Sequence, residues 1–381
     1  MNKYNLEAYN FTLPEELIGQ DLASPPDSCR LLVYKKTTQT LTDWVFTDLP
    51  WLLPKHSSLF FNNSKVLKAR ILLNHIPGRE QQEIFFLHVL DTYRFEALVW
   101  PWKKFKPWTV IQYNDTIQFT IESVSIDWRI IRCNQPILET LDRIGQMAIP
   151  AYIDYKKEKE LAYQPLFAQH PWSVAAPTAS LHFTPRILKQ LEQNNINKHT
   201  ITLHIWLWTF KPVDNEYILD HKIHTEKILI KSNIFEIIAQ HKSNKQPIIA
   251  VWTTVTRTLE TLPYFWLLLS DTEKKQCSAE TLNRRNNLTD SLAQRQAHNV
   301  VQEYHMLDQS TRLVETKLFL HPWESFHIID WLLTNFHTPK STLLMLVAWF
   351  IWLKNMQDIY QHAITTWYKF YSFGDAQLLL P

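Results

Sequence analysis

Glycine is the residue that this chain most clearly lacks. The sequence has 381 residues and 4 glycines, whereas ordinary usage of about 7% would give roughly 27. Turns and close backbone contacts normally need glycine because it has no Cβ atom. Tryptophan is abundant instead, with 16 residues. The exchange of the smallest side chain for the largest needs an explanation.

Several other features are also scarce. Three cysteines, Cys29, Cys133 and Cys277, are too few and too scattered for a disulfide framework or a zinc cluster, and they fit a reducing compartment. Net charge is only +2, so it gives no argument for nucleic-acid binding, although a local basic face is compatible with it. The longest apolar run, Leu343 to Leu353, is shorter than the roughly 18 residues of a membrane span. The polar N-terminus is not a signal peptide, and we expect a cytoplasmic protein outside the membrane.

The hydrophobic pattern divides the chain into two parts. From 69 to 150, short runs such as EIFFLHVL and RFEALVW alternate with turn-like breaks, which predicts a small β-barrel or sandwich. After 150, helical segments alternate with buried strands, as in SNIFEIIAQHKSN before PIIAVW, which favours an α/β domain. The stretch 265–312 is polar and lacks periodicity, so we expect a flexible insertion there.

Two segments place polar side chains where a helix is expected to begin. SVAAPTASLHFT puts Thr178 and His182 just before a helix start at Thr184. VWTTVTRTLE follows a buried strand and puts Thr253 and Arg257 in the first turns of a helix. Amides and hydroxyls at such a start suit a carboxylate or a hydroxyl ligand.

Two further segments end a strand with polar groups. ITLHIWLWTF carries His204 and Thr209, crowded by Trp206 and Trp208. TNFHTPKSTLLML gathers Asn, His and Lys before an apolar helix. Capping by a hydroxyl residue explains part of that segment, but not why these three residue types occur together.

The segment DHKIHTE contains His221, His224 and Glu226. Histidines at this spacing beside a carboxylate could bind a metal, and a solvated polar turn explains them equally well. The sequence shows no nucleotide-binding glycine-rich loop and no order typical of a catalytic triad. The residues alone therefore predict a two-domain α/β protein with a His- and Thr-rich cleft.

Several of these segments resemble the signature blocks of a known family. SVAAPTASLHFT, TFKPV, DHKIHTE, TTVTRTLE, TNFHTPKSTLLMLV and YKFYSFGDAQLLL are similar to blocks of the S-adenosylmethionine:tRNA ribosyltransferase-isomerases of queuosine biosynthesis. LFFNNSKVLKAR and IPAYID resemble the family's N-terminal and domain-junction blocks, and all of them come in the family's order. The resemblance covers nearly the whole chain except about 265–312.

The resemblance implies a fold and a reaction. The fold would be a mixed α/β main domain built from both ends of the chain, 1–68 and 151–381, with a small β-barrel domain inserted at 69–150. The reaction would move the ribosyl unit of S-adenosylmethionine, isomerised to an epoxycyclopentane-diol, onto 7-aminomethyl-7-deazaguanine at the tRNA wobble position, giving epoxyqueuosine. S-adenosylmethionine would be a substrate, with no metal or other cofactor. The partners would be that substrate and a tRNA anticodon loop, and the protein would act as a monomer.

The resemblance also implies roles for the polar residues. The sulfonium acidifies the neighbouring C5′ hydrogens, so a base must remove one of them. The acid–base candidates are His204, His221 and His337. The substrate-binding candidates are Thr178, His182, Thr209, His224, Glu226, Thr253, Arg257 and Asn335. Lys103, Lys104 and Lys106 could contact RNA phosphates or could simply be solvated.

Tryptophan stands where this family usually has glycine. The positions are 102, 108, 172, 206, 208, 252, 323, 331 and 352. We hypothesise that these residues are glycines in the natural protein, written as tryptophan because UGA codons read as glycine were translated as tryptophan. The alternative is an inactive RNA-binding relative whose site is blocked by real indoles. A methyltransferase is a third interpretation, but no glycine-rich loop supports it even after Trp→Gly restoration.

Overall fold

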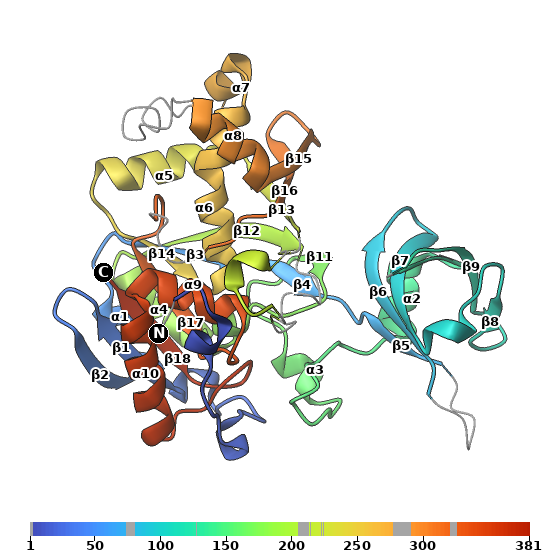
Figure 1. The fold of residues 1–381 in the computed structure, drawn as a ribbon, viewed down its shortest axis with the longest axis horizontal. Coiled ribbons are helices and arrows are strands. Elements are labelled where there is room, and N and C mark those ends of the chain that lie inside the picture. Colours follow the sequence, from blue (N-terminus) through green and yellow to red (C-terminus); the bar gives the residue numbers. More distant parts are fainter. Residues whose placement is uncertain are drawn as a thin grey trace.

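The computed structural model describes residues 3–73, 81–126, 128–204, 213, 215–221, 223, 225–276, 291–320 and 326–381. Figure 1 shows a large lobe, built around a ten-stranded sheet, and a small lobe, built around a six-stranded sheet. Both ends of the chain belong to the large lobe.

The large lobe is organised by its ten-stranded sheet, whose strand order is β15-β16-β13-β12-β3-β14-β17-β18-β1-β2. The strands are β1 (Arg30–Lys35), β2 (Thr40–Val45), β3 (Ser58–Asn62), β12 (Asn197–His204), β13 (Glu226–Lys231), β14 (Ile248–Val251), β15 (Val301–Met306), β16 (Thr311–Thr316), β17 (Trp331–Asn335) and β18 (Ala376–Leu380). The four central strands β12, β3, β14 and β17 run parallel. Their carboxyl ends therefore meet at one edge of the sheet, here called the carboxyl edge.

The centre of this sheet is hydrophobic on both faces. Every residue of β3 and β14 is buried, as is usual for parallel strands covered by helices. The long helix α6 (Thr253–Leu268) packs against all four central strands. The other α-helices of this lobe are α1 (Leu49–Leu52), α3 (Lys159–Ala162), α4 (Pro185–Gln193), α5 (Asn233–Ser243), α7 (Asp271–Gln276), α8 (Ser291–Val300), α9 (Thr342–Ile351) and α10 (Leu353–Thr365). The short 3-10 helices are η1 (Leu6–Tyr9), η2 (Glu15–Leu17), η3 (Pro26–Ser28), η4 (Phe46–Asp48), η6 (Thr178–His182) and η8 (Ile218–Asp220).

The small lobe contains the β-rich segment predicted after residue 69. Its antiparallel sheet has the order β5-β6-β7-β10-β9-β8 and curls into a half-barrel (Figure 1). The elements are β5 (Arg70–Leu72), β6 (Glu83–Val89), β7 (Arg94–Trp100), η5 (Trp102–Lys104), β8 (Val110–Gln112), β9 (Gln118–Val124), β10 (Arg129–Cys133) and α2 (Ile137–Ile144). Its hydrophobic core is formed by residues between Leu67 and Ala148, joined by Val174. A short parallel pair, β4 (Ser64–Val66) and β11 (His170–Ser173), lies where the chain passes between the lobes.

Local signals in the sequence mark element ends correctly. Thr184 caps α4, where its hydroxyl accepts a hydrogen bond from the backbone N–H of Ile187 at 3.3 Å. The sequence offers Thr338 and Ser341 as caps for α9, and it is Ser341 that caps this helix in the same way. Gly145 follows the last residue of α2. The described parts of the stretch 265–312 contain α7, α8 and β15. Among the described residues, no helix is both long and apolar enough to cross a bilayer.

Among the described tryptophans, four adopt a backbone conformation that suits glycine. They are Trp108 (φ 62°), Trp252 (φ 89°), Trp352 (φ 72°) and Trp367 (φ 63°). Positive φ is a genuine outlier for a bulky side chain. Trp252 and Trp352, with ψ of 150° and 146°, lie near a region that is essentially reserved for glycine.

Trp367 occupies the position after a helix end that glycine commonly fills. Its N–H donates to the Ile364 carbonyl, and the N–H of Tyr368 donates to the Ala363 carbonyl, which closes α10 with a Schellman motif. The described glycines, by contrast, have no positive φ and are required by close backbone approach. These conformations favour the glycine hypothesis at Trp108, Trp252 and Trp352, and they extend it to Trp367.

Candidate functional site

The sheet topology gathers predicted site residues at the carboxyl edge. His204 ends β12, and Asn335 ends β17. Thr253 begins α6 directly after β14. Glu226 belongs to the same edge because it begins β13, which runs antiparallel to β12 and pairs Lys227 with His204. All four side chains are buried.

Asn335 is the centre of a buried polar cluster. The Thr178 hydroxyl donates to Asn335 Oδ1 at 2.8 Å, and Asn335 Nδ2 donates to His182 Nε2 at 3.1 Å. Both partners come from η6, which packs against β17. Burial lowers the pKa of His182 to about 4, so its imidazole is neutral at pH 7 and can accept this bond. The cluster joins three of the predicted binding residues.

A second cluster lies where α6 begins. Arg257 Nη1 forms an ion pair with Glu226 Oε1 at 2.8 Å, and Arg257 Nε donates to the Leu318 carbonyl at 3.1 Å. Arg257 Nη2 and the hydroxyls of Thr253 and Thr254 are buried and have no hydrogen-bond partner among the described residues. An unsatisfied buried donor costs ~1–3 kcal/mol. Glu226 already supplies one carboxylate to Arg257, so the donors left for a second carboxylate are Arg257 Nη2 and the two hydroxyls. The helix dipole adds a preference for negative charge at this end.

The other two acid–base candidates lie in different surroundings. His337 is buried, with Nε2 at 3.1 Å from the Thr334 hydroxyl, and its backbone N–H donates to the Tyr360 hydroxyl at 3.0 Å. Burial lowers the pKa of His337 to about 3, so it is neutral at pH 7. His221 follows η8, and its ring centre lies 6.1 Å from that of Phe319. The positions 206, 208, 209 and 224, which carry Trp206, Trp208, Thr209 and His224, lie outside the described residues.

His204 faces the small lobe. Its ring packs edge-to-face on His88 of β6, with ring centres 5.8 Å apart. Burial, with a smaller effect from Lys227, lowers the pKa of His88 to about 4, so the His88 ring, like those of His182 and His337, is neutral at pH 7. His88 is not among the site residues predicted from the sequence. Its signal was a single polar imidazole within the apolar run EIFFLHVL.

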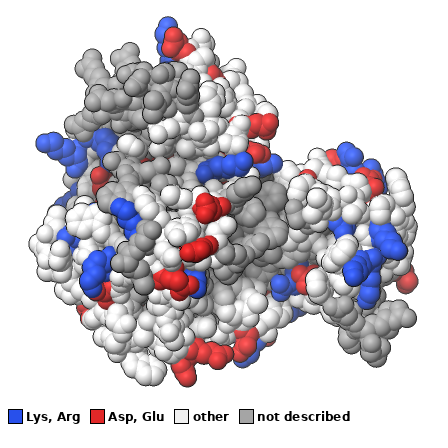
Figure 2. Space-filling view, viewed as in Figure 1, with Lys and Arg blue, Asp and Glu red and all other residues white. Residues whose placement is uncertain are grey.

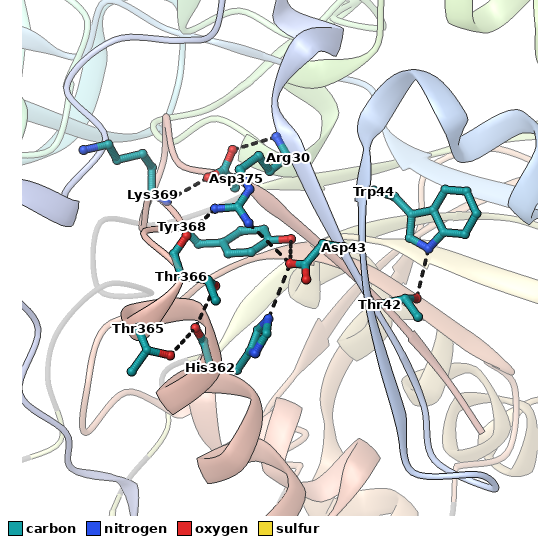
Figure 3. A network of polar contacts seen from close by, with 10 residues as sticks. All are labelled: Arg30, Thr42, Asp43, Trp44, His362, Thr365, Thr366, Tyr368, Lys369 and Asp375. Carbon is teal, nitrogen blue, oxygen red and sulfur yellow. Dashed lines mark hydrogen bonds and ion pairs between the residues drawn. The ribbon is translucent and has the colours of Figure 1, made fainter.

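A network of ionic and aromatic contacts holds the C-terminal block in place (Figure 3). The Asp375 carboxylate accepts a hydrogen bond from the backbone N–H of Arg30 at 2.8 Å. The Arg30 guanidinium lies over the Tyr368 ring, 3.7 Å from its centre, and the Tyr368 hydroxyl donates to Asp43 at 2.6 Å. Asn335 Nδ2 also donates to the Asp375 carbonyl at 3.4 Å. The network around Asp375 therefore helps to fix the position of the Asn335 side chain.

The lysines that were considered for phosphate contact lie on the small lobe. Lys103, Lys104 and Lys106 are exposed in and beside η5. Lys103 Nζ lies 5.7 Å from the Trp102 ring centre. Figure 2 shows lysine and arginine side chains on the visible face of this lobe.

Comparison with known proteins matches the chain over nearly all of its length. The family model for queuosine biosynthesis protein matches residues 6–379. An S-adenosylmethionine:tRNA ribosyltransferase-isomerase from Nitratiruptor sp. is 34% identical over 391 residues, covering 100% of both chains. A protein of the same name from Treponema denticola is 35% identical, covering 98% of this chain and 99% of its own.

A solved structure has a similar fold. It is the crystal structure of an S-adenosylmethionine tRNA ribosyltransferase from Thermotoga maritima, with a TM-score of 0.51 and 24% identity, covering 98% of this chain and 100% of that one. At this identity the likeness concerns the fold alone. The sequence matches decide the family: the chain belongs to the queuosine biosynthesis protein family.

Proposed function

We propose that this protein is an S-adenosylmethionine:tRNA ribosyltransferase-isomerase. The observation that carries the proposal is the full-length similarity, at 34–35% identity, to relatives of that name. The finer reaction is the one that the resemblance implies: transfer and isomerisation of the ribosyl unit to 7-aminomethyl-7-deazaguanine at the wobble position, with release of adenine and methionine. An active enzyme is supported over a blocked RNA-binding relative.

The two clusters at the carboxyl edge suit different parts of S-adenosylmethionine, the ribosyl donor. The anion-favouring start of α6, with Thr253 and Arg257, would bind the methionine carboxylate. The Asn335–Thr178 pair offers neutral hydrogen-bonding groups of the kind that ribose hydroxyls need. S-adenosylmethionine is a substrate in this scheme, and the scheme needs no metal or other cofactor.

His204 is the acid–base candidate best placed for the reaction. Both His204 and His337 are buried. His204 ends a central strand and faces the contact between the lobes, whereas His337 Nε2 lies beside the Thr334 hydroxyl within the large lobe. A neutral imidazole is the form that can remove a proton from C5′. Departing adenine then needs a proton or a hydrogen bond at its ring nitrogen. The His204 imidazolium, which holds the proton removed from C5′, can supply it.

The RNA partner is a tRNA anticodon loop. Its wobble base must unstack to reach a side chain as buried as His204. The small lobe would then be an inserted β-barrel domain spanning 69–150. Lys103, Lys104 and Lys106 give it a positive face of the kind that phosphates bind.

Adenine release tests the proposal. The full chain is incubated with S-adenosylmethionine and an anticodon stem-loop that carries 7-aminomethyl-7-deazaguanine at the wobble position, and adenine is measured by chromatography. A stem-loop with guanine at that position is the matched control. Two versions are compared, the chain as written and one with glycine at the suspect tryptophans. We expect release only with the aminomethyl base and only from the glycine version, and equal release from the two versions would show that the tryptophans are tolerated. Absence of adenine from both versions would contradict the proposed function.

A further inference from the structure

A cavity of about 230 Å³ lies between the two lobes. Leu67, Phe86 and Leu138 line it from the small-lobe side, and Leu313 lines it from the large lobe. Two imidazoles, His88 and His204, supply polar groups to these largely apolar walls. Cavities with apolar walls and a few converging polar groups are typical of small-ligand sites.

The two imidazoles reach the cavity from different lobes. His204 is fixed at the end of β12 in the large lobe. His88 lies in β6, where the pairing register with β7 shifts between Phe86 and His88. Such a shift turns side chains relative to a regular strand, and here the His88 ring packs edge-to-face on His204. The polar end of the cavity is therefore complete only when both lobes contribute.

The chemistry of these groups indicates a class of ligand. Lys227, which also lines the cavity, is paired with Glu315 at 3.2 Å, so its charge is already matched. A neutral imidazole offers one donor and one acceptor. Apolar walls that can hold a flat ring, together with such edge groups, suit a neutral heteroaromatic base.

The position of the cavity indicates which nucleobase it receives, the wobble base of the RNA or the adenine of S-adenosylmethionine. Leu138 is 39% exposed, so the cavity wall reaches the surface. A base that projects from a polynucleotide can enter from there while its phosphates stay outside. The methionine carboxylate of the donor, by contrast, is matched by the carboxylate-favouring groups at the start of α6.

We propose that this cavity receives the unstacked acceptor base of the RNA, with His88 of the small lobe and His204 of the large lobe contacting its edge. This inference rests on the proposed function for the identity of the RNA. It adds His88 as a specificity-determining residue and assigns the small lobe a direct part in base recognition.

The test measures RNA binding without turnover. A fluorescent anticodon stem-loop carrying 7-aminomethyl-7-deazaguanine, and the same stem-loop with an abasic wobble nucleotide, are titrated with the full chain in the absence of S-adenosylmethionine. Leu138→Trp fills the mouth of the cavity at a partly exposed position. His88→Phe keeps a ring against His204 but removes its hydrogen-bonding nitrogens. His305→Phe, at an exposed histidine in β15, is the matched control.

We expect both cavity variants to bind the base-bearing RNA about tenfold more weakly, the loss that corresponds to about 1.4 kcal/mol. The abasic RNA should bind the unchanged protein and both variants with equal affinity, because the missing base and the altered cavity remove the same contact. The control variant should bind both RNAs as the unchanged protein does. Equal loss with both RNAs, or no loss with either, would overturn the proposal. The binding assay does not depend on turnover, so its outcome is independent of the adenine-release assay that tests the proposed reaction.

Discussion

Trp352 provides a direct test of whether the tryptophans stand at glycine positions. It joins α9 to α10 with φ 72° and ψ 146°, and its side chain is 60% exposed. The indole also lies over Lys36, with Nζ 4.2 Å from a ring centre. The perturbation is a pair of variants, Trp352→Gly and Trp352→Ala, because both lose the indole and its contact with Lys36. Their difference in stability isolates the backbone.

The expected magnitude follows from two opposing effects. Alanine keeps a Cβ atom in a conformation that costs ~1–3 kcal/mol for residues other than glycine. Glycine gains more freedom in the unfolded chain, which costs it ~0.4–1 kcal/mol relative to alanine. The glycine variant should therefore have the higher free energy of unfolding, by roughly 0.5–2 kcal/mol.

Trp51 is the matched control. It is 71% exposed within α1 and does not have a positive φ. At an ordinary helical position glycine is less stable than alanine by ~0.5–1 kcal/mol. Urea unfolding of the four variants should thus give differences of opposite sign at the two sites. A Trp352→Ala variant as stable as Trp352→Gly would refute the reasoning.

Four further outcomes follow. If tryptophan marks glycine codons, the intact mass of the natively expressed protein will be lower than the written sequence requires, by one indole-bearing side chain at each such position; an unshifted mass would end the hypothesis. Gly374→Ala should lower the free energy of unfolding by ~1–3 kcal/mol, because a Cβ atom there would lie 2.4 Å from the Phe370 carbonyl carbon; urea titration measures it, and a neutral result would contradict the close approach. His204→Ala should slow adenine release by ~10²–10⁴ if His204 is the general base, and full turnover would exclude it. The pKa of His182 is lowered from 6.5 to about 4, so the folded protein binds fewer protons than the unfolded chain between these values. The contribution of neutral His182 to the free energy of unfolding is present above pH 6.5 and is lost as the pH falls towards 4. His182→Gln removes this titration, so the free energy of unfolding should fall less over that pH range.

The sequence by itself determined the features that depend on neighbours along the chain. The helix start at Thr184 follows from a hydroxyl side chain that reaches the amide three residues ahead, whereas for α9 the sequence left Thr338 and Ser341 as alternative caps. The alternation of helices and buried strands after 150 follows from hydrophobic periodicity. The ordered signature blocks indicated the family. The resemblance to that family also marked nine tryptophans, of which Trp108, Trp252 and Trp352 have positive φ.

Only the tertiary structure decided which distant residues meet. Thr178 bonds to Asn335, 157 residues away, because η6 packs at the end of β17. His88 reaches His204 because a register shift in β6 and the placement of the small lobe bring the two rings together. Strand order, register and lobe placement depend on long-range packing, and no pattern within one local segment specifies them. The same packing encloses His337 beside Thr334 and Tyr360, so identical residue types with similar sequence signals received different surroundings.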